Sequence, residues 1–308
     1  MNKIQKVTVL GAGAMGAYFA SRFFDTEGFS TRFVARDRRL ERLKAKGLVV
    51  NGKQYDIPAV HPDEVEQPAD LIIVALKQYH LQEAVHDLKT SVGDSTTIIS
   101  IMNGLDSEEF IGSVYGMDKL LYAVSVGIDA VREGNRITYT KPGKHYLGEA
   151  VNTSLSPGVL RVQRAFEEAG ITYETPEDMM RMMWWKFMVN VGMNQASAVM
   201  RAPYGFFQTF PEARGLMEAL MQEVIALAEV QGIAVTSRDI EEWYSFLDGL
   251  SPQGKTSMLQ DVEAGRKTEV EMFGGKVVDM GKTHQVPTPV NQTVFQIIRV
   301  LEYSASEM

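Results

Sequence analysis

Gly11-Ala12-Gly13-Ala14-Met15-Gly16 lies near the start of the chain, between an apolar run at Val7–Leu10 and a helical pattern from Ala14 to about Thr26. The run is short and partly β-branched and ends at glycine, which is typical of a buried parallel strand. A G-x-G-x-x-G pattern alone occurs by chance, and a glycine-rich turn that binds nothing is the plain alternative. Between a strand and a helix, however, the three glycines permit in order a tight turn, close approach of the backbone to a pyrophosphate, and close helix–sheet packing. The stretch therefore predicts a dinucleotide-binding turn whose helix N-terminus faces the phosphates.

Strands and helices alternate through the first half of the chain. Further strands are predicted at 31–35, 71–76, 97–102, 121–128 and 136–147, and helices at 37–46, 81–88 and within 157–173. This alternation predicts an α/β domain of Rossmann type, with a parallel sheet and right-handed crossovers.

After Thr175-Pro176 the pattern becomes long, helical and rich in methionine. Helices are predicted at 179–199, 212–231, 238–247, 268–280 and 290–302. We therefore expect two domains, residues 1–177 in α/β and residues 178–308 all-helical, which also suits a chain longer than one core usually serves.

Composition excludes several classes of protein. The formal net charge of −8 argues against a surface built to grip nucleic acid. The absence of cysteine excludes a disulfide framework, Cys-ligated zinc and thiol catalysis. With no recognisable signal peptide and no apolar run of about 18–20 residues, a cytoplasmic protein without a membrane segment is expected. The apolar helical half is compatible with a homodimer, since apolar faces often mark interfaces.

The end of the second predicted strand bears on the choice of dinucleotide. An acidic residue there favours NAD, and an arginine favours the 2′-phosphate of NADP. Arg36 follows Phe33-Val34-Ala35, with Arg38 and Arg39 close behind, and favours NADP(H). Asp37 keeps NAD(H) open, because a shift of one position would place a carboxylate at the ribose. Arg38 and Arg39 are also compatible with a solvated helix face.

Lys186, Asn190 and Asn194 recur every four residues on the first helix of the second half, so they line one face with a drift of about 40° per step. Their neighbours are almost all apolar, and burying such groups without partners costs a few kcal/mol each. A polar cleft would explain the row; a solvent-facing row, or one paired with carbonyl groups, is the alternative. A lysine in apolar surroundings releases its proton more easily, which suits a general acid acting on a carbonyl oxygen.

The chain resembles the ketopantoate reductase (2-dehydropantoate 2-reductase) family in motifs spread along its length. The matching motifs are the glycine-rich turn, Ala75-Leu76-Lys77, Met102-Asn103-Gly104, the Lys186/Asn190/Asn194 row, Ser257–Asp261 and Thr268-Glu269. The resemblance implies a Rossmann domain joined to a helical domain of 6-phosphogluconate dehydrogenase type, with the active site in the cleft. It also implies NADPH-dependent reduction of a 2-keto acid, in pantothenate and coenzyme A biosynthesis.

The resemblance assigns the substrate residues. Lys186 matches the general acid, while Asn190, Asn194 and Ser257 match residues that hold the hydroxyl and carboxylate ends of the substrate. Asn103 matches a residue that meets both nicotinamide and substrate.

The resemblance also assigns the cofactor residues. The turn from Gly11 to Gly16 would bind the pyrophosphate, Arg36 would receive the 2′-phosphate and Lys77 would lie against the cofactor. Asn103 and Glu269 would lie near the nicotinamide, and Glu269, near the catalytic lysine, would be the second catalytic residue beside Lys186.

The residues themselves leave plainer interpretations open for four of these positions. Lys77 and Asn103 each follow an apolar strand, where open α/β sheets bind ligands, but a surface lysine and an Asn-Gly turn would look the same. Ser257 could begin a helix, and Glu269 could be a solvated helix charge.

One departure from the family pattern puts the substrate in doubt. The family often has Pro-Asn-Gly soon after the lysine helix, whereas this chain has Ala202-Pro203-Tyr204-Gly205. An aromatic residue at that position could shape the pocket or pack in the core. A D-2-hydroxyacid dehydrogenase for another branched or aromatic 2-keto acid, with NADH as an open alternative cofactor, is therefore the alternative enzyme. A non-catalytic dinucleotide sensor is the alternative outside enzymes.

Overall fold

The computed structural model describes residues 3–307, and their contacts divide the chain into two compact units, one ending at Met182 and the other beginning at Met183. The division falls within helix α6 (Met179–Val189), which carries the chain from the first unit into the second. The domain boundary near residue 177 stays a prediction.

The first unit is built on an eight-stranded sheet. Its strands are β1 (Lys6–Leu10), β2 (Ser30–Val34), β5 (Ala59–Val60), β6 (Leu71–Val74), β7 (Thr97–Ser100), β8 (Leu120–Ile128), β11 (Pro142–Gly148) and β12 (Tyr173–Glu174). They lie in the order β12-β11-β8-β7-β6-β1-β2-β5. All neighbouring pairs are parallel except β8 and β11, which are antiparallel. The α/β fold expected for the first half is confirmed.

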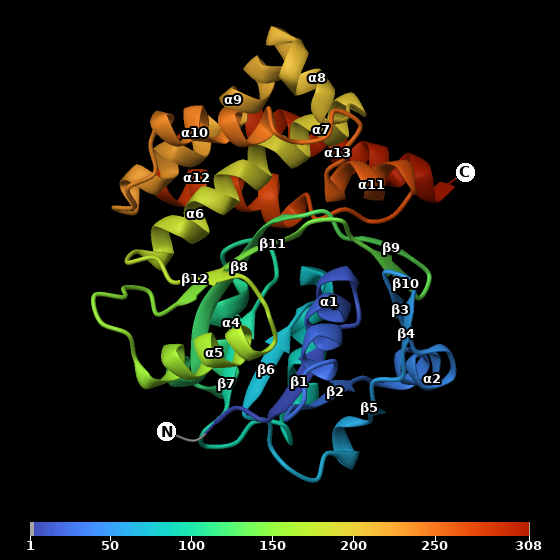
Figure 1. Ribbon diagram of the computed structural model, residues 1–308. Helices are drawn as coiled ribbons and strands as arrows, with labels where there is room; N and C mark the ends of the chain where they lie inside the picture. The colour runs from blue at the N-terminus through green and yellow to red at the C-terminus, as the bar shows by residue number, and fades with distance from the viewer. Residues whose placement is uncertain (1–2, 308) are drawn as a thin grey trace. The chain divides into compact units, whose positions relative to one another are not determined.

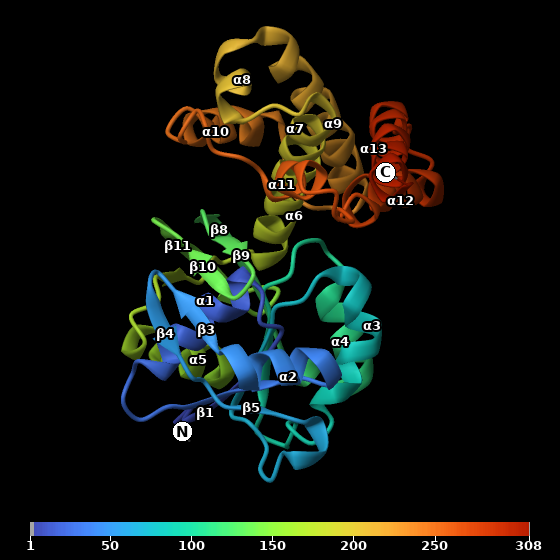
Figure 2. The ribbon, with the colours of Figure 1, turned by 90° about the vertical axis from the view of Figure 1, so that its right-hand side faces the viewer.

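Helices cover both faces of this sheet, as Figures 1 and 2 show. The helices are α1 (Ala14–Phe24), α2 (Asp37–Lys46), α3 (Leu81–Ala84), α4 (Ser107–Tyr115) and α5 (Pro157–Glu168), with the 3₁₀ helix Val85–Leu88 continuing α3. Successive residues of a strand pack into cores on opposite faces of the sheet, because side chains alternate across a sheet. Val7 and Val9 pack with α1 and α5, whereas Ile72 and Val74 pack with α3 and α4. Burial on both faces explains why these strands are continuous apolar runs.

A second, four-stranded sheet was not recognised as a separate sheet from the sequence. It consists of β3 (Leu48–Val50), β4 (Lys53–Tyr55), β9 (Val131–Glu133) and β10 (Arg136–Thr138), in the order β4-β3-β10-β9. The stretch at 136–147, predicted as one β region, is therefore divided between two sheets. The strands are only three residues long, so each carries too little periodicity to be recognised from sequence.

The second unit is helical, as predicted. After the rest of α6 come α7 (Gln195–Met200), α8 (Tyr204–Thr209), α9 (Pro211–Val230), α10 (Ser237–Leu247), α11 (Ser257–Glu263), α12 (Lys276–His284) and α13 (Pro289–Glu307). Two π-helical segments, Asn190–Asn194 and Glu271–Gly275, lie between α6 and α7 and directly before α12. Within residues 3–307, every helix is too short or too polar to span a bilayer.

A buried asparagine on α13, Asn291, joins neighbouring helices in the core of the second unit. Asn291 is fully buried and donates to the carbonyl oxygen of Leu220 and to the carboxylate of Glu223 on α9, at 3.1 and 2.7 Å. It accepts a bond from Gln195 on α7 at 2.8 Å. Buried amides with satisfied partners fix the relation of the helices that they join. Helix α7, which continues from the polar row, is thus held firmly in its unit.

Candidate functional site

Four of the predicted cofactor positions lie at the carboxyl ends of four adjacent parallel strands. The glycine-rich turn follows β1, Arg36 follows β2, Lys77 follows β6 and Asn103 follows β7. Because the sheet order is β7-β6-β1-β2, these positions share one edge of the sheet. Lys77 and Asn103 are both half-buried, so neither is a fully solvated surface group. This edge is where open α/β sheets bind ligands.

Each of the three glycines meets a different steric demand. Gly11 has φ +104°, and a Cβ there would lie 2.3 Å from the carbonyl oxygen of Ala75. A Cβ on Gly16 would lie 1.8 Å from the carbonyl oxygen of Gly11. A Cβ on Gly13 would meet only the Ala75 oxygen, at 3.9 Å, within ordinary contact distance. The fold therefore requires Gly11 and Gly16 but leaves open space beside Gly13, the position where a dinucleotide pyrophosphate would approach the backbone.

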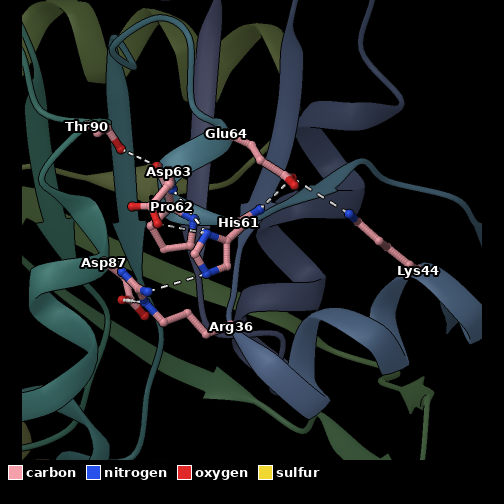
Figure 3. Close-up of polar contacts among 8 residues, drawn as sticks. All are labelled: Arg36, Lys44, His61, Pro62, Asp63, Glu64, Asp87 and Thr90. Carbon is pink, nitrogen blue, oxygen red and sulfur yellow. Dashed lines mark hydrogen bonds and ion pairs between the residues drawn. The ribbon is translucent and has the colours of Figure 1, made fainter.

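Arg36, the predicted 2′-phosphate residue, lies in a polar cluster (Figure 3). Its Nε donates to the carboxylate of Asp87, and its Nη1 lies 3.3 Å from Nε2 of His61. Asp37, Arg38 and Arg39 are exposed on helix α2, as expected for a solvated face. Neither Asp87 nor His61 carried a signal in the sequence, because both are ordinary surface residue types.

The polar row on the first helix of the second unit is largely buried and internally bonded. Asn190 and Asn194 are 5% and 7% exposed, which excludes a row that faces solvent. Asn194 donates from Nδ2 to Oδ1 of Asn190 at 3.2 Å. Its own Oδ1 accepts from Ser257 Oγ at 3.2 Å and from the N–H of Met258 at 3.3 Å. The structure thus connects three of the predicted substrate residues, and the fourth, Asn103, lies in the first unit.

The helix carrying this row departs from α-helical geometry at the two asparagines. Asn190–Asn194 is a π-helical turn, with i→i+5 bonding, where the sequence predicts a continuous helix. The other π segment, Glu271–Gly275, begins two residues after Glu269, and the two segments contact each other. Glu269 is 7% exposed and is therefore not a solvated charge. Single π turns inside helices are frequent at functional sites.

Lys186 lies on α6, one helical turn before Asn190. Its side chain is half-buried among apolar neighbours, and this desolvation lowers the pKa of its ammonium group to about 8. A group with that pKa is mostly protonated at neutral pH yet releases its proton readily. It can therefore serve as a general acid.

A buried acid follows the Asn103-Gly104 loop and was missed by sequence reasoning. Glu108, in the first turn of α4, is fully buried, and burial raises the pKa of its carboxyl group to about 7. Ser107 Oγ donates to its Oε2 at 2.8 Å and lies 2.7 Å from Ser100 Oγ. An acidic first turn is typical of a solvated helix start, so the sequence offers no sign of this burial.

Comparison with known proteins now assigns the chain to a family. The model for "Ketopantoate reductase PanE/ApbA" matches residues 7–152, and the model for its C-terminal domain matches residues 178–302. The chain belongs to the ketopantoate reductase family. It is an oxidoreductase of this family, and both the resemblance and the two-part fold expected from the sequence are confirmed.

The relatives match nearly the whole length of this chain. A 2-dehydropantoate 2-reductase of Archaeoglobus fulgidus is 27% identical, with 97% of this chain and 99% of the relative covered. A D-mandelate dehydrogenase solved with NADH and anilino(oxo)acetate has a TM-score of 0.89 at 21% identity, covering 98% of this chain and 99% of that one. A dimeric ketopantoate reductase of Staphylococcus aureus has a TM-score of 0.82 at 20% identity, with 97% and 99% covered. At these identities the two structures show the fold alone.

Proposed function

We propose that the chain reduces ketopantoate (2-dehydropantoate) to pantoate with NADPH, using Lys186 as the general acid. The observation that carries the proposal is the lysine with a lowered pKa beside buried, mutually bonded amides on one helix. The nicotinamide of a bound dinucleotide would supply the hydride that reduces the carbonyl carbon of the substrate. Lys186 Nζ donates the proton that the carbonyl oxygen takes up as the alkoxide forms.

The remaining residues of the second unit bind and orient the substrate in this proposal. Asn190, Asn194 and Ser257 offer amide and hydroxyl groups whose positions are fixed by their bonds to one another. Such preorganised polar groups suit a small acid that carries hydroxyl, carbonyl and carboxylate groups. Glu269 contributes a buried carboxyl group next to the second π segment.

The first unit binds the dinucleotide. The open space beside Gly13, the unpaired N–H groups expected at the start of α1 and the positions of Lys77 and Asn103 all fit such a ligand. Arg36 supports NADPH, because its fixed guanidinium fork suits a 2′-phosphate.

Tyr204 favours a second candidate within the same reaction class. It opens α8 and is half-buried, with its N–H donating to the carbonyl oxygen of Gly254 at 3.0 Å and its ring against Gly254, three residues before Ser257. An aromatic ring packed against Gly254, which precedes a substrate position by three residues, supports a D-2-hydroxyacid dehydrogenase for an aromatic or branched 2-keto acid. The structural likeness to a D-mandelate dehydrogenase with NADH favours the same reading.

A panel of 2-keto acids with NADPH and NADH tests these candidates. We expect the highest kcat/KM for ketopantoate with NADPH. A phenyl- or isopropyl-bearing 2-keto acid that reacts far faster than ketopantoate would replace the first candidate by the second. Dinucleotide binding without turnover of any keto acid would instead favour the sensor. The cytoplasmic location stays a prediction, and so does the homodimer, although the dimeric relative supports it.

A further inference from the structure

The cluster around Arg36 joins three separate parts of the first unit (Figure 3). Arg36 precedes α2, His61 begins the short 3₁₀ turn Pro62–Glu64 after β5, and Asp87 lies in the 3₁₀ helix that continues α3. The guanidinium contacts both of the other side chains. Residues distant in the chain thus meet at the position where the adenosine ribose of the dinucleotide would lie in the proposed function.

Asp87 is the more deeply buried partner of the Arg36–Asp87 pair. The side chain of Asp87 is 14% exposed, whereas that of Arg36 is 43% exposed. Thr90 Oγ1 donates to the carbonyl oxygen of Pro62 at 2.6 Å, which ties the end of the Asp87 helix to the His61 turn. A ligand therefore meets an exposed guanidinium that is already bonded to a more deeply buried carboxylate.

His61 is also held in place. The backbone N–H of Asp63 donates to Nδ1 of His61 at 3.3 Å, and the backbone N–H of His61 donates to Oε2 of Glu64 at 3.2 Å. Nδ1 of His61 also lies 3.4 Å from Oδ2 of Asp63, and its Nε2 faces Nη1 of Arg36 at 3.3 Å. Arginine has no acceptor, so its guanidinium donates to whatever acceptor lies beside it. The anion that accepts from Arg36 is Asp87.

We propose that Asp87 is a specificity-determining residue for the dinucleotide, because its carboxylate bonds to the guanidinium group that would otherwise bind a ribose 2′-phosphate. A cofactor without the phosphate leaves the Arg36–Asp87 pair intact. A cofactor with the phosphate must draw Arg36 away from Asp87, or share it with a carboxylate that repels the incoming dianion. Such a repulsive element lowers affinity for one ligand and spares the other. The chain consequently prefers NADPH over NADH less strongly than Arg36 alone implies.

This inference rests on the proposed binding of a dinucleotide at this edge of the sheet. Its test is the affinity of the full chain for four ligands, measured by isothermal titration calorimetry. NADPH and NADH form one pair, and adenosine 2′,5′-bisphosphate and AMP form a second pair that probes the adenosine end without the nicotinamide. The comparison is between the wild-type chain and Asp87→Asn, which keeps the shape of the side chain and removes its charge.

We expect Asp87→Asn to bind NADPH and the bisphosphate about tenfold more tightly, equivalent to about 1.4 kcal/mol, with NADH and AMP within about twofold of wild type. Asp63→Asn is the matched control. Its side chain is 77% exposed and lies 3.4 Å from His61 Nδ1, so it removes the same charge from the same cluster without a bond to Arg36. It should change every affinity by less than about twofold. In the Arg36→Ala background, Asp87→Asn should no longer favour the phosphate-bearing ligands.

Other results overturn the inference. Weaker NADPH binding by Asp87→Asn would mean that Asp87 positions Arg36 for the phosphate. An unchanged ratio of the NADPH and NADH affinities would mean that Asp87 neither positions Arg36 nor competes with the phosphate for it. Asp87→Ser, measured in parallel, reports the same sign if the asparagine variant folds poorly. Failure of the wild-type chain to bind either dinucleotide would refute the proposed function itself, a result that the affinities distinguish from a change in their ratio.

Discussion

At the scale of single residues, the environment of a side chain decides what its chemistry can do. Lys186 and Glu108 are ordinary charged residues in the sequence, and in the fold both are removed from water, which disfavours their charged forms. Desolvation lowers the pKa of the lysine and raises that of the acid, so both move toward neutrality. Arg36 shows the opposite case, because its bond to the Asp87 carboxylate raises the pKa of its guanidinium group.

Lys186→Ala should lower kcat for keto-acid reduction by about 10²–10⁴-fold, the usual contribution of general acid catalysis, with little change in dinucleotide affinity. In the wild type, the reduction rate should fall as pH rises through about 8, because the protonated lysine is the donor. Lys186→Arg should also be slow, since arginine keeps the charge but does not release its proton. The measurements are pH–rate profiles and cofactor titrations.

Lys282→Ala serves as the matched control for this lysine. Its side chain is 71% exposed on α12 of the same unit, and it should keep wild-type turnover. Near-normal turnover in Lys186→Ala would remove Lys186 from the mechanism.

At the scale of elements, local geometry at helix starts and turns determines where functional groups lie. The turn between β1 and α1 needs two glycines for the fold and leaves the third position open. In the second unit, the π turn at Asn190–Asn194 brings two amides into contact with each other and with the start of α11. Both features concentrate polar groups at places where a regular helix would bury apolar ones.

Two alanine substitutions separate folding from binding in the glycine-rich turn. Gly16→Ala should destabilise the protein by several kcal/mol, because its Cβ would overlap the carbonyl oxygen of Gly11. Gly13→Ala should fold with a melting temperature near that of wild type and bind the dinucleotide at least about tenfold more weakly. Thermal unfolding and calorimetric titration distinguish the two. A Gly13→Ala variant with unchanged affinity would show that the pyrophosphate does not approach this backbone.

At the scale of the whole molecule, the first unit buries two titratable groups with opposite effects on stability. Glu108 has a pKa near 7 when folded and 4.5 as its ordinary value, so its contribution is present below pH 4.5 and lost as pH rises through 7. His145, 2% exposed among Tyr18, Phe19 and Phe166, has a pKa lowered by burial to about 4 from 6.5. Its contribution is present above pH 6.5 and lost as pH falls through 4. Between pH 4.5 and 6.5 the two slopes oppose each other.

Glu108→Gln should therefore make the free energy of unfolding rise more steeply with pH between 4.5 and 7. Above pH 7 the variant should be more stable than wild type by up to about 3 kcal/mol, because it buries no carboxylate. Urea unfolding at four pH values across this range measures the effect. An unchanged pH dependence would mean that Glu108 is not the buried acid that titrates there.

The sequence by itself determined the fold class, because continuous apolar strands, the glycine-rich turn and amphipathic helices are signals within short stretches of chain. It also identified the row of Lys186, Asn190 and Asn194, since four-residue spacing on a helix is local information. Only the tertiary structure decided that Asn194 bonds to Ser257, that Asp87 and His61 meet Arg36, and that Glu108 is buried. Those relations join residues far apart in the chain, or depend on what packs over a helix start. Spacing along one segment carries no information about such contacts, because burial and charge pairing arise only when separate elements pack together.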